Sequence, residues 1–270
     1  MIFMYIRRHS RSARELCETG EVELDRAAGV LRAARQVTVL TGAGISTDSG
    51  IPDFRGPQGV WTRNPAAERT STLSHYLHEP EVRQLAWQQR LASPAWKAEP
   101  NRGHAALVDL ERQGRLVALV TQNIDELHQR AGSDADLVVE LHGTMRRVVC
   151  WSCGVEGAME PTLDRVRAGD PDPHCLACGG ILKSATISFG QALDPVTIAR
   201  AEAAVVRCDV LLAVGSSLGV YPAAGLVPLA RDAGAEVVIV NGEPTPFDPI
   251  ASAVVRGSIS EALPVLVAPA

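Results

Sequence analysis

Five short apolar runs, each followed by glycine or polar residues, constrain the fold of this chain more than any other feature. The runs are apolar throughout instead of alternating, and helical patterns lie between several of them. Strands of this kind are buried on both faces, as in a parallel sheet that helices cover on each side. We therefore expect an α/β fold. The predicted strands cover residues 37–40, 116–120, 137–141, 209–214 and 236–240, and the clearest helices cover 21–35, 195–206 and 222–233.

The residues that follow these runs are the ones that we expect to bind a ligand. The carboxyl ends of parallel strands meet at one edge of a sheet, and open α/β sheets bind ligands at that edge. The five runs end at Gly42, Gln122, His142, Gly215 and Asn241. The pattern therefore predicts one binding site built from loops that are far apart in the chain.

The first of these loops reads Gly42-Ala43-Gly44, directly after a predicted strand. Glycines at this point allow backbone amides to approach a pyrophosphate, and Gly42 and Gly44 can take positive φ angles without steric cost. An ordinary glycine turn is the alternative. Thr47 stands where a dinucleotide fingerprint has its third glycine, which argues against an oxidoreductase that transfers hydride.

Other strand ends supply the remaining groups that a dinucleotide needs. Gly215-Ser216-Ser217 offers amides and hydroxyls for phosphates, while Asn241 and Glu243 suit ribose hydroxyls or the edge of an adenine. These loops together predict a dinucleotide site.

A second group of polar residues is expected at the same edge. It contains two amides, a carboxylate and an imidazole, from Gln122, Asn123, Asp125 and His142. A histidine that exchanges a proton near neutral pH, beside a carboxylate, is the usual equipment of a general base. A hydrogen-bonded structural histidine is the alternative for His142.

Four of the six cysteines form two CxxC pairs, Cys150 with Cys153 and Cys175 with Cys178. Two chelating pairs of thiolates are the ligand set of a closed structural Zn²⁺ site, which has no open position for catalysis. A redox pair or a disulfide framework is the alternative. We therefore predict one structural zinc ion in a small module.

Composition excludes some partners. The net charge of −5 gives no electrostatic footprint for nucleic acid or an anionic membrane. No apolar run approaches the roughly 20 residues that span a bilayer, and the first residues lack the apolar centre of a secretion signal. We expect a cytoplasmic protein without membrane or direct nucleic-acid binding, and residues 1–20 as an N-terminal extension without fixed structure. The sequence does not indicate an oligomeric state.

The motifs, in their order, resemble the sirtuin family of NAD-dependent protein deacylases. The likeness extends from about Val37 to Ile259. The matching motifs are Gly42-Ala43-Gly44-Ile45-Ser46, residues 50–55 and 121–125, His142-Gly143, the two CxxC pairs, Phe189-Gly190, and residues 215–218 and 241–243. Several independent motifs in the same order are far more specific than any one of them.

The resemblance implies a Rossmann-like NAD-binding domain with an inserted zinc module. Residues 21–144 and 183–270 would form the NAD-binding domain, and residues 145–182 the zinc-binding module. Residues 61–100 would be a helical insertion that belongs to the small domain. NAD and an acylated protein lysine would meet between the two parts. The implied products are nicotinamide, O-acyl-ADP-ribose and free lysine, with acetyl as the expected acyl group.

The resemblance also assigns roles to single residues. His142 matches the base that deprotonates a ribose hydroxyl, and Asn123 and Asp125 match residues that position the nicotinamide ribose and its water. Phe54 matches a ring in a mobile cofactor loop that shields the reactive carbon from water. The implied NAD contacts are Gly42, Ala43, Gly44, Ile45, Asp53, Phe54, Arg55, Trp61, Gln122, Asn123, Ile124, Asp125, Gly215, Ser216, Ser217, Asn241, Gly242, Glu243 and Ile259.

Substrate contacts are the part of the resemblance with the clearest departures. The implied contacts are Trp87, Arg90, Phe189 and Gly190. Sirtuins that remove succinyl groups carry a Tyr and an Arg at the spacing of Trp87 and Arg90, so the Trp here disfavours acidic acyl groups. The alternative is that Trp87 lies in a core and Arg90 in solvent. Residues 182–191 also depart from the family pattern along the expected lysine channel, and Pro264 is expected to shorten or kink a terminal helix.

Three other functions remain open at this point. A longer-chain deacylase or a protein ADP-ribosyltransferase would use the same site. A zinc-ribbon binding module is the alternative that is not an enzyme.

Overall fold

Six parallel strands form the central sheet, in the order β3-β2-β1-β7-β8-β9. The computed structural model describes residues 13–57 and 59–269. The strands are β1 (Val37–Thr41), β2 (Leu116–Thr121), β3 (Val138–Glu140), β7 (Val210–Val214), β8 (Glu236–Val240) and β9 (Ala253–Val255). The five predicted strands are confirmed. Strand β9 was not expected, because three residues are too few to show a periodic pattern.

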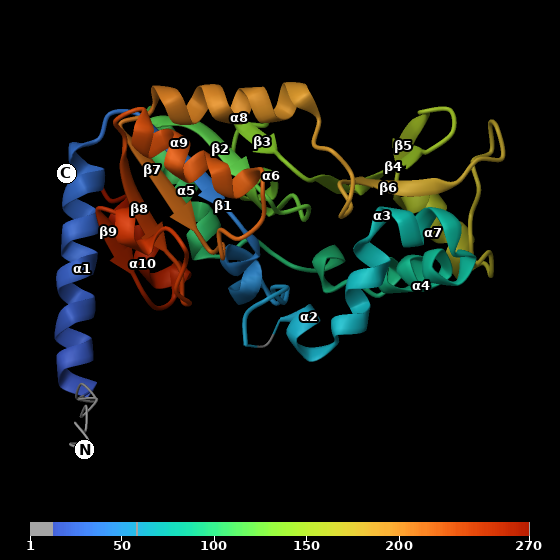
Figure 1. The fold of residues 1–270 in the computed structure, drawn as a ribbon, viewed down its shortest axis with the longest axis horizontal. Coiled ribbons are helices and arrows are strands. Elements are labelled where there is room, and N and C mark those ends of the chain that lie inside the picture. Colours follow the sequence, from blue (N-terminus) through green and yellow to red (C-terminus); the bar gives the residue numbers. More distant parts are fainter. Residues whose placement is uncertain (1–12, 58, 270) are drawn as a thin grey trace, which may run out of the picture.

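Helices cover both faces of this sheet (Figure 1). Helices α1 (Ala13–Ala33), α5 (Arg102–Arg112) and α10 (Ile259–Leu266) pack on one face, around a core that includes Leu31, Leu107 and Leu263. Helices α8 (Pro195–Arg207) and α9 (Leu226–Asp232) cover the other face, with Val205 and Val227 among their buried residues. The sheet is therefore the middle of three layers, as the continuous apolar runs predict.

Side chains cap two of these helices at their N-terminal ends. Asn101 accepts hydrogen bonds from the first turn of α5, and His104 completes a capping box by accepting from the backbone of Asn101. Asp194 accepts from the amide of Thr197 at the start of α8. Both caps satisfy amides that a helix leaves without partners, so each fixes where its helix begins.

The two ends of the chain differ from expectation in detail. Helix α1 begins at Ala13, eight residues before the predicted start, and residues 1–12 lie outside the described part. At the other end, α10 is short, as predicted, but Pro264 lies inside it and the helix ends at Leu266.

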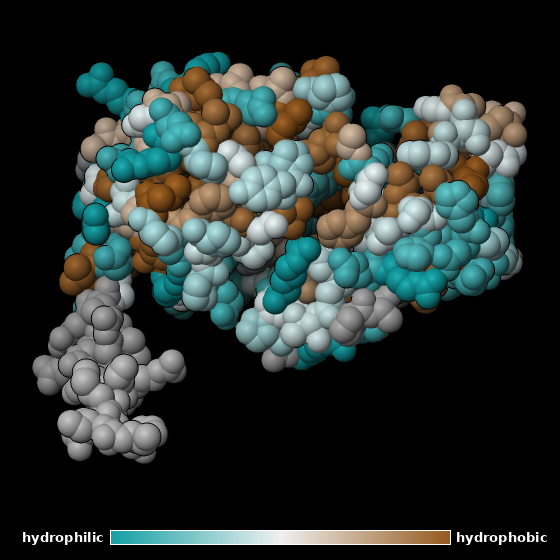
Figure 2. Space-filling view, viewed as in Figure 1, coloured by the Kyte–Doolittle hydropathy of each residue, from teal (hydrophilic) through white to brown (hydrophobic). Residues whose placement is uncertain are grey.

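The second lobe combines a helical segment with a small antiparallel sheet (Figure 1). Its helices are α2 (Val60–Arg63), α3 (Leu73–His78), α4 (Pro80–Leu91) and α7 (Glu160–Arg167), and its strands are β4 (Gly143–Cys150), β5 (Glu156–Ala158) and β6 (Leu182–Thr186). A separate core, built around Trp87, Met159 and Leu163, holds this lobe together. The surface is hollowed between the two lobes (Figure 2). Residues 61–100 are mainly helical, as predicted.

The remaining elements are short. They are α6 (Leu127–Ala131) and the 3-10 turns η1 (Ala43–Ser49), η2 (Pro65–Ser71), η3 (Pro94–Trp96), η4 (Ala223–Gly225) and η5 (Asp248–Ile250). Within the part of the chain that the structure describes, none of the helices combines the length and the apolar character that a membrane span requires.

Candidate active site

The glycine turn after β1 packs directly against the turn after β7. Gly42 N donates to Val214 O at 2.9 Å, and Gly44 N donates to Gly215 O at 2.8 Å. A Cβ atom at Gly44 would lie 2.7 Å from the Cα of Gly215, and one at Gly42 would lie 2.8 Å from its carbonyl oxygen. Glycine is required here because two backbones touch.

The turn does not use the positive φ angles that Gly42 and Gly44 could take. Gly42 has a φ of −131°, which any residue adopts, and Gly44 is not among the glycines with positive φ. Gly215, in the facing turn, is the one with positive φ, at 62°. The close approach of two strand ends, and not left-handed backbone at Gly42 and Gly44, explains both glycines.

The groups that fit a dinucleotide lie along this same edge. Gln122 Nε2 donates to Ser216 Oγ at 2.9 Å, which fixes that hydroxyl beside the glycine turn. Asn241 Nδ2 donates to the carbonyl of Glu243 at 2.7 Å and holds the loop after β8. Neutral hydroxyls, amides and backbone groups are the donors that phosphate and ribose oxygens accept from, so the donor set fits NAD.

Ile259 lies behind the glycine turn, in the same core cluster as Ile45. Its side chain is buried in the core of the large lobe at the start of α10, against the site of Gly103 on α5. In the structure, Ile259 is therefore a packing residue of that core.

The loop after β2 holds Asn123 and Asp125 against the glycine turn. Asn123 Nδ2 donates to Gly42 O and to Ser46 Oγ, each at 3.2 Å. Ser46 Oγ in turn donates to Asp125 Oδ2 at 2.8 Å. All three side chains are buried. Ser46 was missed as a site residue, because a serine inside a glycine-rich turn carries no signal beyond its place in the motif.

His142 faces this loop in a defined tautomer. Its Nδ1 lies 2.9 Å from the carbonyl oxygen of Gln122, which can only accept, so Nδ1 carries the proton and Nε2 keeps its lone pair. Burial lowers the pKa of His142, and the bond to Gln122 opposes this effect only in part. A half-buried neutral imidazole with a free Nε2 can act as a base.

Two further contacts join the loop after β2 to the start of β4. Met145 N donates to Ile124 O at 3.0 Å, and Thr144 Oγ1 donates to Glu126 Oε1 at 2.5 Å. Glu126 itself has a φ of 61°, a conformation that non-glycine residues adopt rarely. These contacts, with the one at His142, hold the imidazole at a set place relative to Asp125.

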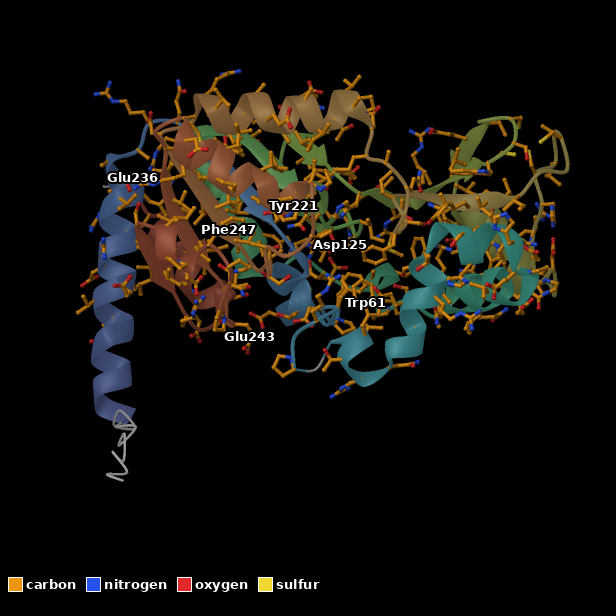
Figure 3. The ribbon with its side chains drawn as sticks, viewed as in Figure 1. Trp61, Asp125, Tyr221, Glu236, Glu243 and Phe247 are labelled. Atoms are coloured by element: carbon orange, nitrogen blue, oxygen red, sulfur yellow. The ribbon has the colours of Figure 1, made fainter. Side chains whose placement is uncertain are left out.

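Three aromatic rings lie in contact around residues 53–61. Trp61 lies 4.6 Å from the ring of Phe54 and 5.3 Å from the ring of Phe189, measured between centroids. The guanidinium of Arg55 lies 4.7 Å above Trp61. Trp61 and Asp125 both lie in the region between the lobes (Figure 3). Residues 53–61 are thereby connected to the segment that follows β6.

The four predicted zinc ligands form one cluster. Their Sγ atoms all lie within 4.8 Å of one another. Cys150 and Cys178 are 3.5 Å apart, and Cys153 and Cys175 are 3.9 Å apart. A tetrahedron with Zn–S bonds of about 2.3 Å has S–S edges of about 3.8 Å, so the cluster fits one zinc ion.

Trp87 and Arg90 have different environments. Trp87 is fully buried in the core of the small lobe, which agrees with the alternative that the sequence left open for it. Arg90 is half-buried and donates from Nη2 to Ser184 Oγ at 2.6 Å, so it is not the solvated residue of that alternative. Its partner belongs to the segment that departs from the family pattern, where Lys183 is buried and has a pKa lowered to about 7 by burial.

Two buried histidines lie behind the loop after β2. The rings of His104 and His128 are 5.0 Å apart, and both side chains are buried. Burial lowers the pKa of His104 to about 4 and the pKa of His128 well below its usual range. Both rings are therefore neutral near pH 7.

We expect this pair to make the protein sensitive to acid. The unfolded chain binds more protons than the folded chain between about pH 6.5 and about pH 4, so the free energy of unfolding falls as the pH decreases through that range. Full protonation of His104 costs about 3 kcal/mol, from 1.36 kcal/mol per pKa unit. Urea unfolding at several pH values measures the slope of the free energy of unfolding against pH. His104→Gln should flatten it, and an unchanged slope in that variant would contradict the assignment.

Comparisons with known proteins agree with this geometry. A model of the Sir2 family matches residues 42–222. NAD-dependent protein deacetylase 2 of Streptomyces coelicolor is 53% identical over 230 residues, which cover 85% of this chain and 95% of that protein. NAD-dependent protein deacylase 2 of Archaeoglobus fulgidus is 40% identical over 249 residues, which cover 92% and 96%.

Solved structures show the same likeness. A chain from work on the mechanism and regulation of Sir2 enzymes superposes with a TM-score of 0.84 at 40% identity, covering 92% of this chain and 97% of that one. A Sir2 protein with a p53 peptide and NAD⁺ superposes with a TM-score of 0.77 at 35% identity, covering 87% and 93%.

Proposed function

This chain belongs to the Sir2 family, and from that premise we propose that it removes acyl groups, preferably acetyl, from protein lysines with NAD as the acceptor. The products are nicotinamide, O-acyl-ADP-ribose and free lysine. The NAD-dependent deacetylases and deacylases among its relatives support this activity. NAD supplies the ribose that accepts the acyl group.

The observation that carries this proposal is the state of His142. Its Nδ1 proton is held by the carbonyl of Gln122, and burial lowers its pKa, so Nε2 is free to take a proton near pH 7. The residue lies at the carboxyl edge of the sheet, beside the loop that carries Asn123 and Asp125. We assign His142 as the base that takes the proton of a ribose hydroxyl.

Asn123 and Asp125 are proposed to orient the nicotinamide ribose. Their side chains share Ser46 as a partner, which leaves neither free to rotate. Groups held in this way lose little conformational entropy when a ligand binds. We assign them together with His142 as the catalytic residues.

The remaining site assignments follow the layout of the loops. NAD contacts are assigned to residues 42–45, 53–55, Trp61, 122–125, 215–217 and 241–243, and for Ile259 the assignment rests on the family likeness alone. The ring stack of Phe54, Trp61 and Phe189 supports exclusion of water from the reacting carbon. Phe189, Gly190 and Arg90 are proposed on the substrate side. Trp87 is part of α4 and anchors this helix in the core of the small lobe.

We propose the NAD-binding domain at residues 21–144 and 183–270, with the zinc module at 145–182 and the insertion at 61–100. The separate core of the small lobe supports this division. Strands β4 and β6 extend a few residues past the proposed limits of the module, to Gly143 and Thr186. Four thiols at zinc-binding distances are typical of a reducing compartment, so we propose the cytoplasm.

A panel of acylated peptides tests the proposed function. Nicotinamide release from NAD should depend on an acylated lysine and should be fastest with acetyl-lysine, slower with long acyl chains and slowest with succinyl-lysine. An unacylated peptide is the control. If nicotinamide release does not depend on the acyl group, and the ADP-ribose part of labelled NAD is transferred to protein, ADP-ribosyl transfer is favoured. Formation of NADH would contradict the proposal.

A further inference from the structure

We infer that Thr41 and His128 are positioning residues for the base, acting through the peptide group between Gln122 and Asn123. This inference rests on the proposed function of His142. Neither residue belongs to the proposed NAD or substrate contacts. Both are buried, and both are linked to His142 by an unbroken series of hydrogen bonds.

The series runs through a single peptide plane. The carbonyl of Gln122 accepts from His142 Nδ1 at 2.9 Å, and the amide of Asn123, in the same peptide group, donates to Thr121 Oγ1 at 3.0 Å. The Thr121 oxygen also accepts from Thr41 Oγ1 at 2.8 Å, and Thr41 Oγ1 lies 2.9 Å from His128 Nε2. The plane is therefore held at its nitrogen by the threonines and at its oxygen by the base.

The direction of these bonds sets the tautomer of His128. Because the Thr41 hydroxyl donates to Thr121, His128 Nε2 must donate to Thr41, which leaves His128 Nδ1 as a bare acceptor. His104 Nδ1 accepts from the amide of Asn101, so its Nε2 carries a proton. Within the described residues, neither His128 Nδ1 nor His104 Nε2 has a hydrogen-bond partner. The arrangement holds only while both rings stay neutral.

The consequence for the base is geometric. The bond to Gln122 sets the plane of the His142 ring, so a rotated peptide group would re-aim Nε2. A misplacement of about 1 Å can lower a rate about 100-fold. Hydrogen bonds in such a series also strengthen one another in a buried place. Removing the Thr41 hydroxyl should weaken the hold on the plane without touching a ligand contact.

Strand β1 offers a matched control. Thr38 is as buried as Thr41 and donates from Oγ1 to the carbonyl of Ala204 at 2.9 Å. The two threonines are three residues apart, so they face opposite sides of the sheet. Replacing either with valine removes one buried hydroxyl from the same strand at nearly equal volume.

The experiment compares steady-state rates and melting temperatures. Thr41→Val should lower kcat about tenfold or more, with the KM for NAD changed by less than about twofold. Thr41→Ser, which keeps the hydroxyl, should recover most of the rate. In Thr38→Val the melting temperature should fall by a similar amount, while kcat should stay at the wild-type value. His128→Leu tests the other end of the series, and the double variant with Thr41→Val should lose no more kcat than either single change.

A second readout needs neither NAD nor peptide. The His142 Nδ1–H signal in ¹H–¹⁵N spectra should shift in Thr41→Val and in His128→Leu, and should stay in place in Thr38→Val. Equal kcat in the two valine variants, or an unmoved signal in Thr41→Val, would overturn the inference. An inactive wild-type protein with the expected shifts would instead contradict the proposed function.

Discussion

Replacing His142 with alanine is expected to lower kcat for deacylation by a factor of about 100 to 10,000, the usual contribution of a general base. Nε2 is the free nitrogen of this ring, and burial keeps it unprotonated near pH 7. NAD binding should survive, because the residues proposed to hold NAD lie on other loops. Single-turnover deacylation and calorimetric titration with NAD measure the two effects separately.

Two further variants distinguish loss of the base from loss of the folded structure. His142→Asn keeps a donor for the carbonyl of Gln122 and removes the base, so it should be as inactive as alanine while melting closer to the wild type. His78→Ala is the matched control, since His78 is exposed and bonds the carbonyl of Ser74 in its own helix. Full activity in either His142 variant would remove this residue from the mechanism.

Replacing Cys150 with serine is expected to abolish zinc binding and unfold the small lobe. Cys150 and Cys175 are both members of the small-lobe core, so the metal and the core stabilise each other. Structural zinc sites contribute on the order of 10 kcal/mol, which is comparable to the whole stability of a domain. The zinc content should fall from one per chain to none, and deacylation should be lost.

The distribution of tryptophans makes this unfolding easy to follow. All four tryptophans, Trp61, Trp87, Trp96 and Trp151, lie outside the large sheet, in or beside the small lobe. Their fluorescence should shift to longer wavelength, while the far-UV signal of the large lobe should remain. Cys208→Ser is the control, because Cys208 is a buried free cysteine between α8 and β7 and should not affect zinc. A folded, active, metal-free Cys150→Ser protein would exclude a structural role for the ion.

Local sequence was sufficient wherever one segment carries its own physical cause. The apolar runs after Gln36 and Arg115 predict β1 and β2, because only strands buried on both faces are apolar throughout. Asn101 sets the start of α5 by a local contact, because its side chain accepts from the first amides of the helix. The CxxC pairs predict the sulfur cluster, since two chelating turns need only approach each other.

Contacts between distant segments were beyond local patterns. The glycines at 42 and 44 could take positive φ angles, yet they are needed because the turn at Gly215 lies against them. Trp87 and Arg90 share a spacing that the sequence could interpret in two ways, and packing in the small lobe separated them.

The sequence by itself determined the layered sheet and the strand ends that meet at one edge of it, because the periodicity of apolar residues is a local property. Tertiary structure alone decided how these residues are held. The bond from His142 to Gln122, the role of Ser46 between Asn123 and Asp125, and the link from His128 to Thr41 all join residues from separate loops and elements. Hydrogen-bond geometry depends on distances of a few tenths of an ångström, and only packing of the whole sheet sets those distances.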